Sequence, residues 1–254
     1  MSADLSAVRA IYFDLDDTLC GYWDACKAAL RIAFQQHPAG DADPETMVRH
    51  WAAAFRVFGK NLKQTHWYPV YLKTGKPTRI EQMRLMLESF DIHDQDHAER
   101  LAETYSVERD RALRLFPESH EVLELLTGRY PMGLITNGPA DIQRQEINTL
   151  GIEHFFDHIY IEGELGEGKP LPSVFERARR AVGCEPHQVL MVGNSYGHDI
   201  KGAIEAGWRT VWIRRSSDVP PSADGNAQPE ERPEGDPAPD MVIGDLREFL
   251  PALG

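Results

Sequence analysis

Three aspartates follow a short apolar run near the start of the chain, and their spacing suits metal-dependent chemistry. Ile11–Phe13 has the length and composition of a buried strand, and Asp14, Asp16 and Asp17 come directly after it. A buried carboxylate is costly unless a cation or a donor compensates it. A divalent ion holds clustered carboxylates in their ionised form. The cluster therefore predicts a metal-dependent site at the end of this strand.

Further polar residues, of the types that metal-assisted phosphoryl or acyl chemistry needs, follow other apolar segments. Thr136-Asn137 comes after one such segment, the stretch from Asn194 to Asp199 comes after another, and Lys169 adds a cation. A parallel sheet brings the carboxyl ends of its strands to one edge, where ligands bind. We therefore expect these residues to build one site.

The elements that must position these residues alternate between short apolar strands and amphipathic helices. Strands are predicted at 11–13, 132–135, 155–161, 189–192, 210–213 and 241–243, and helices at 119–128, 140–150, 173–182, 199–206 and 246–250. This alternation predicts an α/β fold with a doubly wound, Rossmann-like parallel sheet that is covered on both faces.

A block of helical patterns interrupts this alternation after the first strand. The patterns fall at about 23–36, 45–63, 78–90 and 96–113. They predict an inserted all-α cap domain, residues 20–114, over the strand ends. The α/β catalytic core then comprises residues 1–19 and 115–254.

Taken together, the motifs resemble those of the haloacid dehalogenase superfamily. The resemblance rests on Asp14-Leu15-Asp16-Asp17-Thr18, Thr136, Lys169-Pro170 and Gly193-Asn194-Ser195 through Asp199, in that order. It extends over nearly the whole chain, and the helical insert resembles the family's cap at its first insertion point. The resemblance implies a phosphatase-like hydrolase with a helical cap.

The resemblance also implies a catalytic role for three residues. Asp14 would be the nucleophile that forms an aspartyl-phosphate. Asp16 would protonate the leaving group and then deprotonate the attacking water. Lys169 would neutralise the charge on Asp14 and on the transferring phosphoryl group. Asp17 is given no role, and an exposed position is one alternative for it.

Substrate and metal ligands follow from the same resemblance. Thr136 would bind the phosphoryl oxygens with the backbone of Asn137, and Thr18 would support the turn at this substrate-binding site. Mg²⁺ suits such hard oxygen ligands. The expected metal ligands are Asp14, Asp16 through its backbone carbonyl, Asn194 and Asp199.

One position departs from the family's phosphatases, where the residue after the glycine of the fourth motif is usually aspartate. Here it is Asn194, which can ligate through its side-chain oxygen but lacks a full charge. We expect weaker Mg²⁺ affinity unless Asp199 compensates. Asparagine near this position also resembles the metal-free dehalogenases of the superfamily, but those enzymes lack the aspartate found here as Asp16.

Composition limits the class of protein. The formal net charge of −13 over 254 residues argues against general nucleic-acid binding. Three cysteines without metal-ligand spacing suit a reducing compartment. We find no signal-peptide pattern in residues 1–9 and no apolar run of the ~18 residues that span a membrane. A cytoplasmic protein that does not bind membranes is therefore expected.

Two segments stand apart in composition. Residues 216–240 hold six prolines and many acids with almost no large apolar residue, which predicts a mobile, solvated loop. Residues 56–80 of the expected cap hold six basic residues and no acid, beside His66, Trp67, Tyr68 and Tyr71. This stretch is either a solvated basic face or a substrate-facing surface that attracts an anion and stacks on a flat group.

The sequence thus predicts a Mg²⁺-dependent phosphomonoester hydrolase that acts on a small phosphorylated metabolite. A 2-haloacid dehalogenase and a phosphosugar mutase are the alternatives within the superfamily. A catalytically weak binding protein that retains the fold is the alternative from another class. The sequence specifies neither the phosphate ester nor the oligomeric state.

Overall fold

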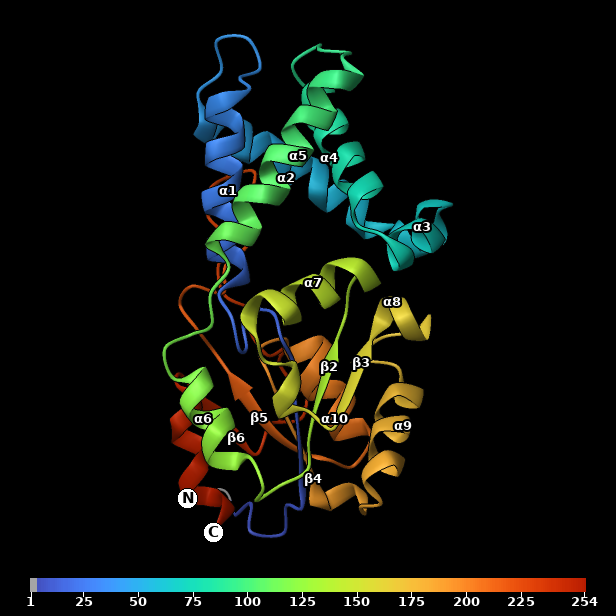
Figure 1. Ribbon diagram of the computed structural model, residues 1–254, viewed down its shortest axis with the longest axis vertical. Coiled ribbons are helices and arrows are strands. Elements are labelled where there is room, and N and C mark those ends of the chain that lie inside the picture. Colours follow the sequence, from blue (N-terminus) through green and yellow to red (C-terminus); the bar gives the residue numbers. More distant parts are fainter. Residues whose placement is uncertain (1–3) are drawn as a thin grey trace.

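The computed structural model describes residues 4–254, and its lower half is a six-stranded sheet (Figure 1). All strand pairs are parallel and the order is β3-β2-β1-β4-β5-β6. This confirms the predicted doubly wound α/β core. The strands are β1 Ala10–Phe13, β2 Met132–Thr136, β3 His158–Ile161, β4 Val189–Gly193, β5 Arg209–Ile213 and β6 Met241–Ile243.

Helices cover both faces of the sheet, as its strand residues require. Ile11 and Phe13 of β1 pack with the apolar cluster of one face, whereas Tyr12 packs with that of the other. The first face is covered by α6 Ser119–Leu126, α7 Ala140–Leu150 and the C-terminal 3₁₀ helix η5 Leu246–Leu253. The second face is covered by α9 Pro172–Val182 and α10 Lys201–Glu205.

Five α-helices and a short 3₁₀ helix, η1 Leu62–Gln64, lie between β1 and α6 and form a separate layer above the strand ends, which we call the helical layer (Figure 1). They bury an apolar cluster of their own that includes Phe34, Trp51 and Leu101. Within the described residues this segment contains helices and no sheet strand, as predicted. The exact domain boundaries stay a prediction. The helices are α1 Tyr22–Gln36, α2 Pro44–Lys60, α3 Trp67–Lys73, α4 Lys76–Glu88 and α5 Gln95–Ala112.

Several predicted element bounds were wrong. The strand expected at 155–161 begins only at His158, because Glu153–Phe155 form a 3₁₀ turn (η2) that buries Phe155 in the core. The helix expected at 199–206 begins earlier as a π-helical turn, η4 Tyr196–Ile200, before α10. No sequence pattern predicted α3 or the four-residue helix α8 Glu162–Leu165.

The segment 216–240 contains no helix or strand, but polar contacts join it to the core. Asp236 pairs with Lys201 of α10 at 3.0 Å, and the hydroxyl of Tyr196 donates to the Pro237 carbonyl at 2.7 Å. Its predicted mobility stays a prediction. None of the described helices is long and apolar enough to span a membrane.

Candidate active site

The polar clusters of the sequence meet at the carboxyl ends of β1, β2 and β4. Because β1 lies between the other two strands, Asp14 is flanked by Thr136 on one side and by Asn194 on the other. This is the point where the strand order reverses, the usual ligand site of such sheets. A cavity of about 250 Å³ opens here. Its lining includes Asp14, Asp16, Thr136, Asn137, Lys169, Asn194, His198 and Asp199.

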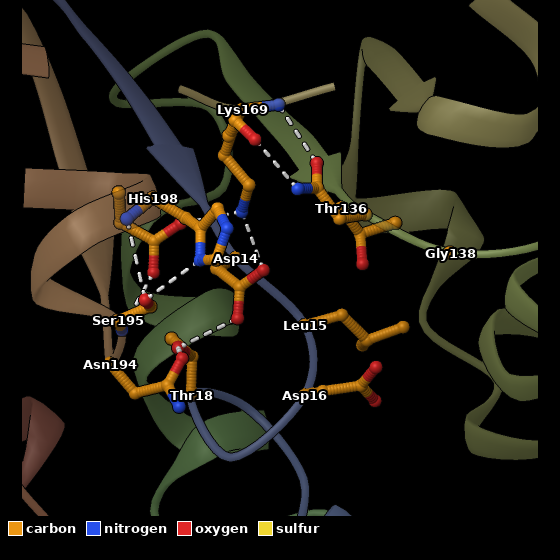
Figure 2. A network of polar contacts seen from close by, with 12 residues as sticks. Asp14, Leu15, Asp16, Thr18, Thr136, Gly138, Lys169, Asn194, Ser195 and His198 are labelled. Atoms are coloured by element: carbon orange, nitrogen blue, oxygen red, sulfur yellow. Dashed lines mark hydrogen bonds and ion pairs between the residues drawn. The ribbon is translucent and has the colours of Figure 1, made fainter. Parts of the chain in front are cut away.

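Lys169 lies between two carboxylates at the base of this cavity. Its Nζ is 2.6 Å from Asp14 Oδ1 and 2.6 Å from Asp199 Oδ1, and all three side chains are buried. Figure 2 shows the lysine side chain reaching Asp14. Burial raises the pKa of Asp14 to about 6, against the opposing effect of the Lys169 ammonium. The cation therefore keeps a buried carboxylate charged beside the cavity.

The close approach of Asp199 to this group depends on Gly193 at the end of β4. A Cβ at position 193 would lie 2.3 Å from Asp199 Oδ2, so a side chain here would displace the carboxylate. The same Oδ2 accepts a hydrogen bond from the Ser195 backbone N–H at 2.9 Å. Both oxygens of Asp199 thus have partners, one cationic and one from the backbone.

Thr18 and Asn194 face Asp14 from the opposite side to Lys169 (Figure 2). The Thr18 hydroxyl lies 3.1 Å from Asp14 Oδ2 and 3.2 Å from Asn194 Oδ1. One buried hydroxyl therefore brings a carboxylate oxygen and an amide oxygen to the same place.

The side chain of Asp16 points away from Thr18 and Asn194 (Figure 2), and Gln143 of α7 holds it. Gln143 Nε2 donates to Asp16 Oδ2 at 3.1 Å, and Gln143 Oε1 accepts from the Thr136 hydroxyl at 2.6 Å. Burial, with the nearby charge of Glu146, raises the pKa of Asp16 well above its usual range. Sequence reasoning missed Gln143, whose only signal was a polar residue within an amphipathic helix.

A family model described as haloacid dehalogenase-like hydrolase matches residues 11–213, well over half of the chain. The chain belongs to the haloacid dehalogenase-like hydrolase family. The family resemblance of the sequence motifs is thereby confirmed.

Relatives of this hydrolase include several phosphatases. A phosphoserine phosphatase from Thermus thermophilus is 38% identical over 156 residues, or 61% of this chain and 57% of that protein. A glyceraldehyde 3-phosphate phosphatase from Methanopyrus kandleri is 28% identical over 96% of each chain. An N-acylneuraminate-9-phosphatase from Rattus norvegicus is 26% identical over 85% of this chain and 86% of its own.

Solved structures share the fold over nearly the full length of this hydrolase. The HAD-hydrolase YfnB from Bacillus subtilis, bound to magnesium, has a TM-score of 0.71 at 19% identity and covers 97% of this chain and 99% of its own. A 2-haloacid dehalogenase from Pseudomonas syringae has a TM-score of 0.63 at 27% identity and covers 97% and 98%. The α/β core with its helical layer is therefore a known arrangement.

In this haloacid dehalogenase-like hydrolase, Asn137 holds Lys169 in place. Its Nδ2 donates to the Lys169 carbonyl, and its Oδ1 accepts from the Lys169 backbone N–H, both at 2.8 Å. The side chain is thus used for positioning. A substrate contact through its backbone stays a prediction.

The third aspartate of the first motif, Asp17, is buried, so the alternative of an exposed position was wrong. It adopts a left-handed conformation with φ 57°, and its Oδ1 accepts from the Trp23 backbone N–H in the first turn of α1 at 3.2 Å. Burial, with the nearby charge of Asp218, raises the pKa of Asp17 to about 8.

Asp17→Asn is expected to raise the free energy of unfolding, and more so near pH 8 than near pH 5. The carboxyl ionises near pH 4 in the unfolded chain but near pH 8 in the folded one. Between these values the folded state binds the extra proton, so the stability falls as the pH rises. Below pH ~4 the carboxyl does not lower the stability, and above the pKa of the folded state the loss of stability is constant. Asparagine also tolerates the left-handed conformation.

Urea unfolding of the metal-free protein at both pH values measures this effect. Asp24→Asn, at an exposed aspartate of α1, is the control. An unchanged pH dependence in Asp17→Asn would contradict the assignment.

Part of the basic stretch 56–80 faces the core of the hydrolase. Lys63 Nζ lies 3.5 Å from Glu162, which also accepts a hydrogen bond from the Tyr68 hydroxyl at 2.9 Å. Arg79 and Tyr71 line a hollow that adjoins the cavity beside Asp14. The other four basic residues are exposed, as in a solvated basic face, and contact of this stretch with a substrate stays a prediction.

The donor set beside Asp14 fits a hard cation. Within residues 4–254, no group of three His, Cys, Asp or Glu is arranged to hold a metal ion. The oxygens here are of mixed type, because the Asp14 carboxylate and the Asn194 amide oxygen converge on the Thr18 hydroxyl. Mg²⁺ takes one or two carboxylates, other oxygen ligands and substrate phosphate, so the residues present fit this ion.

Proposed function

We propose that the chain is a Mg²⁺-dependent phosphomonoester hydrolase that acts on a small phosphorylated metabolite through an aspartyl-phosphate. The proposal rests on one observation: a second carboxyl, Asp16, borders the same cavity as Asp14. An ester oxygen leaves a phosphoryl group readily only if it is protonated, whereas a halide leaves without a proton. A nucleophile with an adjacent acid therefore favours a phosphatase over a dehalogenase.

In the first half-reaction, an Asp14 carboxylate oxygen attacks the phosphorus of the ester. The bond from phosphorus to the ester oxygen breaks, and Asp16 gives its proton to that oxygen. Lys169 neutralises negative charge on the phosphoryl oxygens while the phosphoryl group is transferred from the ester oxygen to Asp14. Its contacts with Asp14 and Asp199 hold the ammonium in position, so the lysine side chain need not rearrange during the reaction.

In the second half-reaction, Asp16 removes a proton from a water molecule. The water oxygen attacks phosphorus, the bond to Asp14 breaks, and inorganic phosphate and a free Asp14 carboxylate result. Gln143 supports both steps because it holds the Asp16 carboxyl. The Thr136 hydroxyl donates its proton to Gln143 Oε1, and it would turn from this acceptor to donate to a phosphoryl oxygen.

The metal ion would be held by Asp14, the backbone carbonyl of Asp16 and Asn194. We leave Asp199 outside this set, because its two oxygens contact Lys169 and the Ser195 backbone. When bound, the ion would supply positive charge for the phosphoryl oxygens.

The leaving group would occupy the hollow that adjoins the catalytic cavity under the helical layer. Aromatic side chains of this layer line it together with Arg79. The relatives that are named phosphatases act on small phosphate esters, as their names state, which supports a substrate of this size. Closure of the helical layer would exclude water during the first half-reaction.

Phosphate release from p-nitrophenyl phosphate, dependent on added Mg²⁺, tests the proposal. We expect turnover with Mg²⁺ and none after chelation with EDTA. A panel of sugar phosphates, nucleoside monophosphates and phosphorylated acids would then identify the substrate class. Chloride release from a 2-haloacid without metal would support the dehalogenase instead, and no turnover with any divalent ion would support a binding protein.

A further inference from the structure

We propose that Asp218 orients the side-chain amide of Asn194, so that its oxygen faces the metal position beside Asp14. This inference rests on the proposed function, because it concerns the metal site of that reaction. Asp218 lies in the segment 216–240, 24 residues after Asn194. None of the four family motifs includes it, and its segment was expected only to be a solvated loop.

The orientation follows from which groups can donate and which can accept a hydrogen bond. Asn194 Nδ2 donates to Asp218 Oδ2 at 2.9 Å, and Asn194 Oδ1 lies 3.2 Å from the Thr18 hydroxyl. An ionised carboxylate only accepts hydrogen bonds, so the amide nitrogen must face Asp218. The amide oxygen is then left on the side of Asp14. If the amide turned by half a rotation, an NH₂ group would lie there, and it cannot ligate a cation.

Asp218 can act in this way because the start of its segment is anchored. The Arg215 guanidinium donates to the Thr18 carbonyl at 3.0 Å and lies 2.7 Å from Glu118, and both charged side chains are nearly buried. The backbone N–H of Asp218 then donates to the Arg215 carbonyl at 3.2 Å. The carboxylate is therefore fixed relative to the turn that carries Thr18.

The same contact accounts for the residue that departs from the family's phosphatases. An aspartate at position 194 would present an oxygen in either orientation, so it would need no partner to orient it. At 2.9 Å it would also repel Asp218. An asparagine removes the repulsion, but only a fixed acceptor makes it present its oxygen. Asn194 and Asp218 are thus a matched pair.

Isothermal titration of the full-length protein with MgCl₂, without substrate, tests the pair. Asp218→Ala is expected to weaken Mg²⁺ binding by about 10- to 100-fold, the usual effect of removing a partner that orients a ligand. In the Asn194→Asp background, the same substitution is not expected to weaken Mg²⁺ binding, because a carboxylate needs no orientation and the repulsion between the two carboxylates is removed. Asp224→Ala removes a charge from an exposed position of the same segment and should leave the affinity unchanged.

A second variant separates orientation from charge. Asp218→Asn keeps the shape of the side chain and one acceptor oxygen, so it should retain a part of the Mg²⁺ affinity even if Asp218→Ala fails to fold, because only one of its two amide orientations accepts from Asn194 Nδ2. Equal weakening by Asp218→Ala in both backgrounds would show a charge effect and overturn the inference. An unchanged Mg²⁺ affinity of Asp218→Ala with Asn194 in place would also overturn it. Absence of p-nitrophenyl phosphate turnover in the wild type would instead count against the proposed function.

Discussion

Asp14→Asn is expected to lower the rate of phosphate release by at least about 10⁴-fold, the scale on which loss of a nucleophile acts. An amide has no ionised oxygen to attack phosphorus, and no other carboxylate lies in its place. Asp16 points away from Thr18 and Asn194, and both oxygens of Asp199 have partners (Figure 2). Steady-state release of phosphate from p-nitrophenyl phosphate at saturating Mg²⁺ measures the change.

The variant should fold, which makes the loss interpretable. Lys169 keeps Asp199 as a carboxylate partner at 2.6 Å, so its buried charge is not left alone. A thermal unfolding transition by circular dichroism checks this, and Asp24→Asn on the surface of α1 is the control for activity. If Asp14→Asn retained more than about a tenth of the activity, Asp14 would not be the nucleophile.

The sequence predicted the parts of the site that follow directly from the ends of strands. Asp14, Thr136 and Asn194 meet because β1 lies between β2 and β4, and the alternating pattern of strands and helices already implied a parallel sheet. Gly193 needed no separate signal, since it belongs to the same motif as Asp199. Local sequence pattern and sheet topology are sufficient to predict that residues at the strand ends share one site.

The residues that orient the site could not be predicted in this way. Gln143 holds Asp16 across 127 positions of the chain, and Arg215 reaches the Thr18 carbonyl across 197. These pairs form only when the tertiary structure is complete, and neither Gln143 nor Arg215 belongs to a local pattern. Their residue types are common on helices and loops, so composition gives no indication of the contact.

The acidic, proline-rich segment shows a different reason for a missed function. Its composition correctly predicts that it buries few large apolar side chains and forms no regular structure. Composition does not describe polar contacts, however. Glu230 accepts hydrogen bonds from the backbone N–H groups of Tyr196 and Gly197 at 2.8 and 3.0 Å, in the turn within the fourth motif. A segment without an apolar core of its own can thus contribute polar contacts to a site that the strand ends form.

A buried ion pair joins the helical layer to the core behind Asp16. Arg109 of α5 and Glu146 of α7 form it, and both side chains are buried. Glu146 also accepts a hydrogen bond from Gln143 Nε2 at 2.9 Å, and this same nitrogen donates to Asp16. The pair therefore lies next to the group that would act as acid and base.

Arg109→Met is expected to lower the free energy of unfolding by about 3–5 kcal/mol, because it leaves the Glu146 carboxylate buried without its cation. The double variant Arg109→Met/Glu146→Gln should recover much of this loss, since no buried charge is then uncompensated. Urea unfolding at neutral pH measures both.

The surface of the same helix provides the control. Arg111 and Glu108 lie 2.7 Å apart on α5, but the arginine side chain is 71% exposed, so Arg111→Met should cost no more than about 1 kcal/mol. A loss in Arg109→Met as small as in Arg111→Met would contradict the assignment of the pair. Equal loss in the single and double variants would show that packing of the long arginine side chain, and not the stranded charge, decides the stability. Recovery in the double variant would show that charge compensation holds the helical layer against α7, beside the residue that positions Asp16.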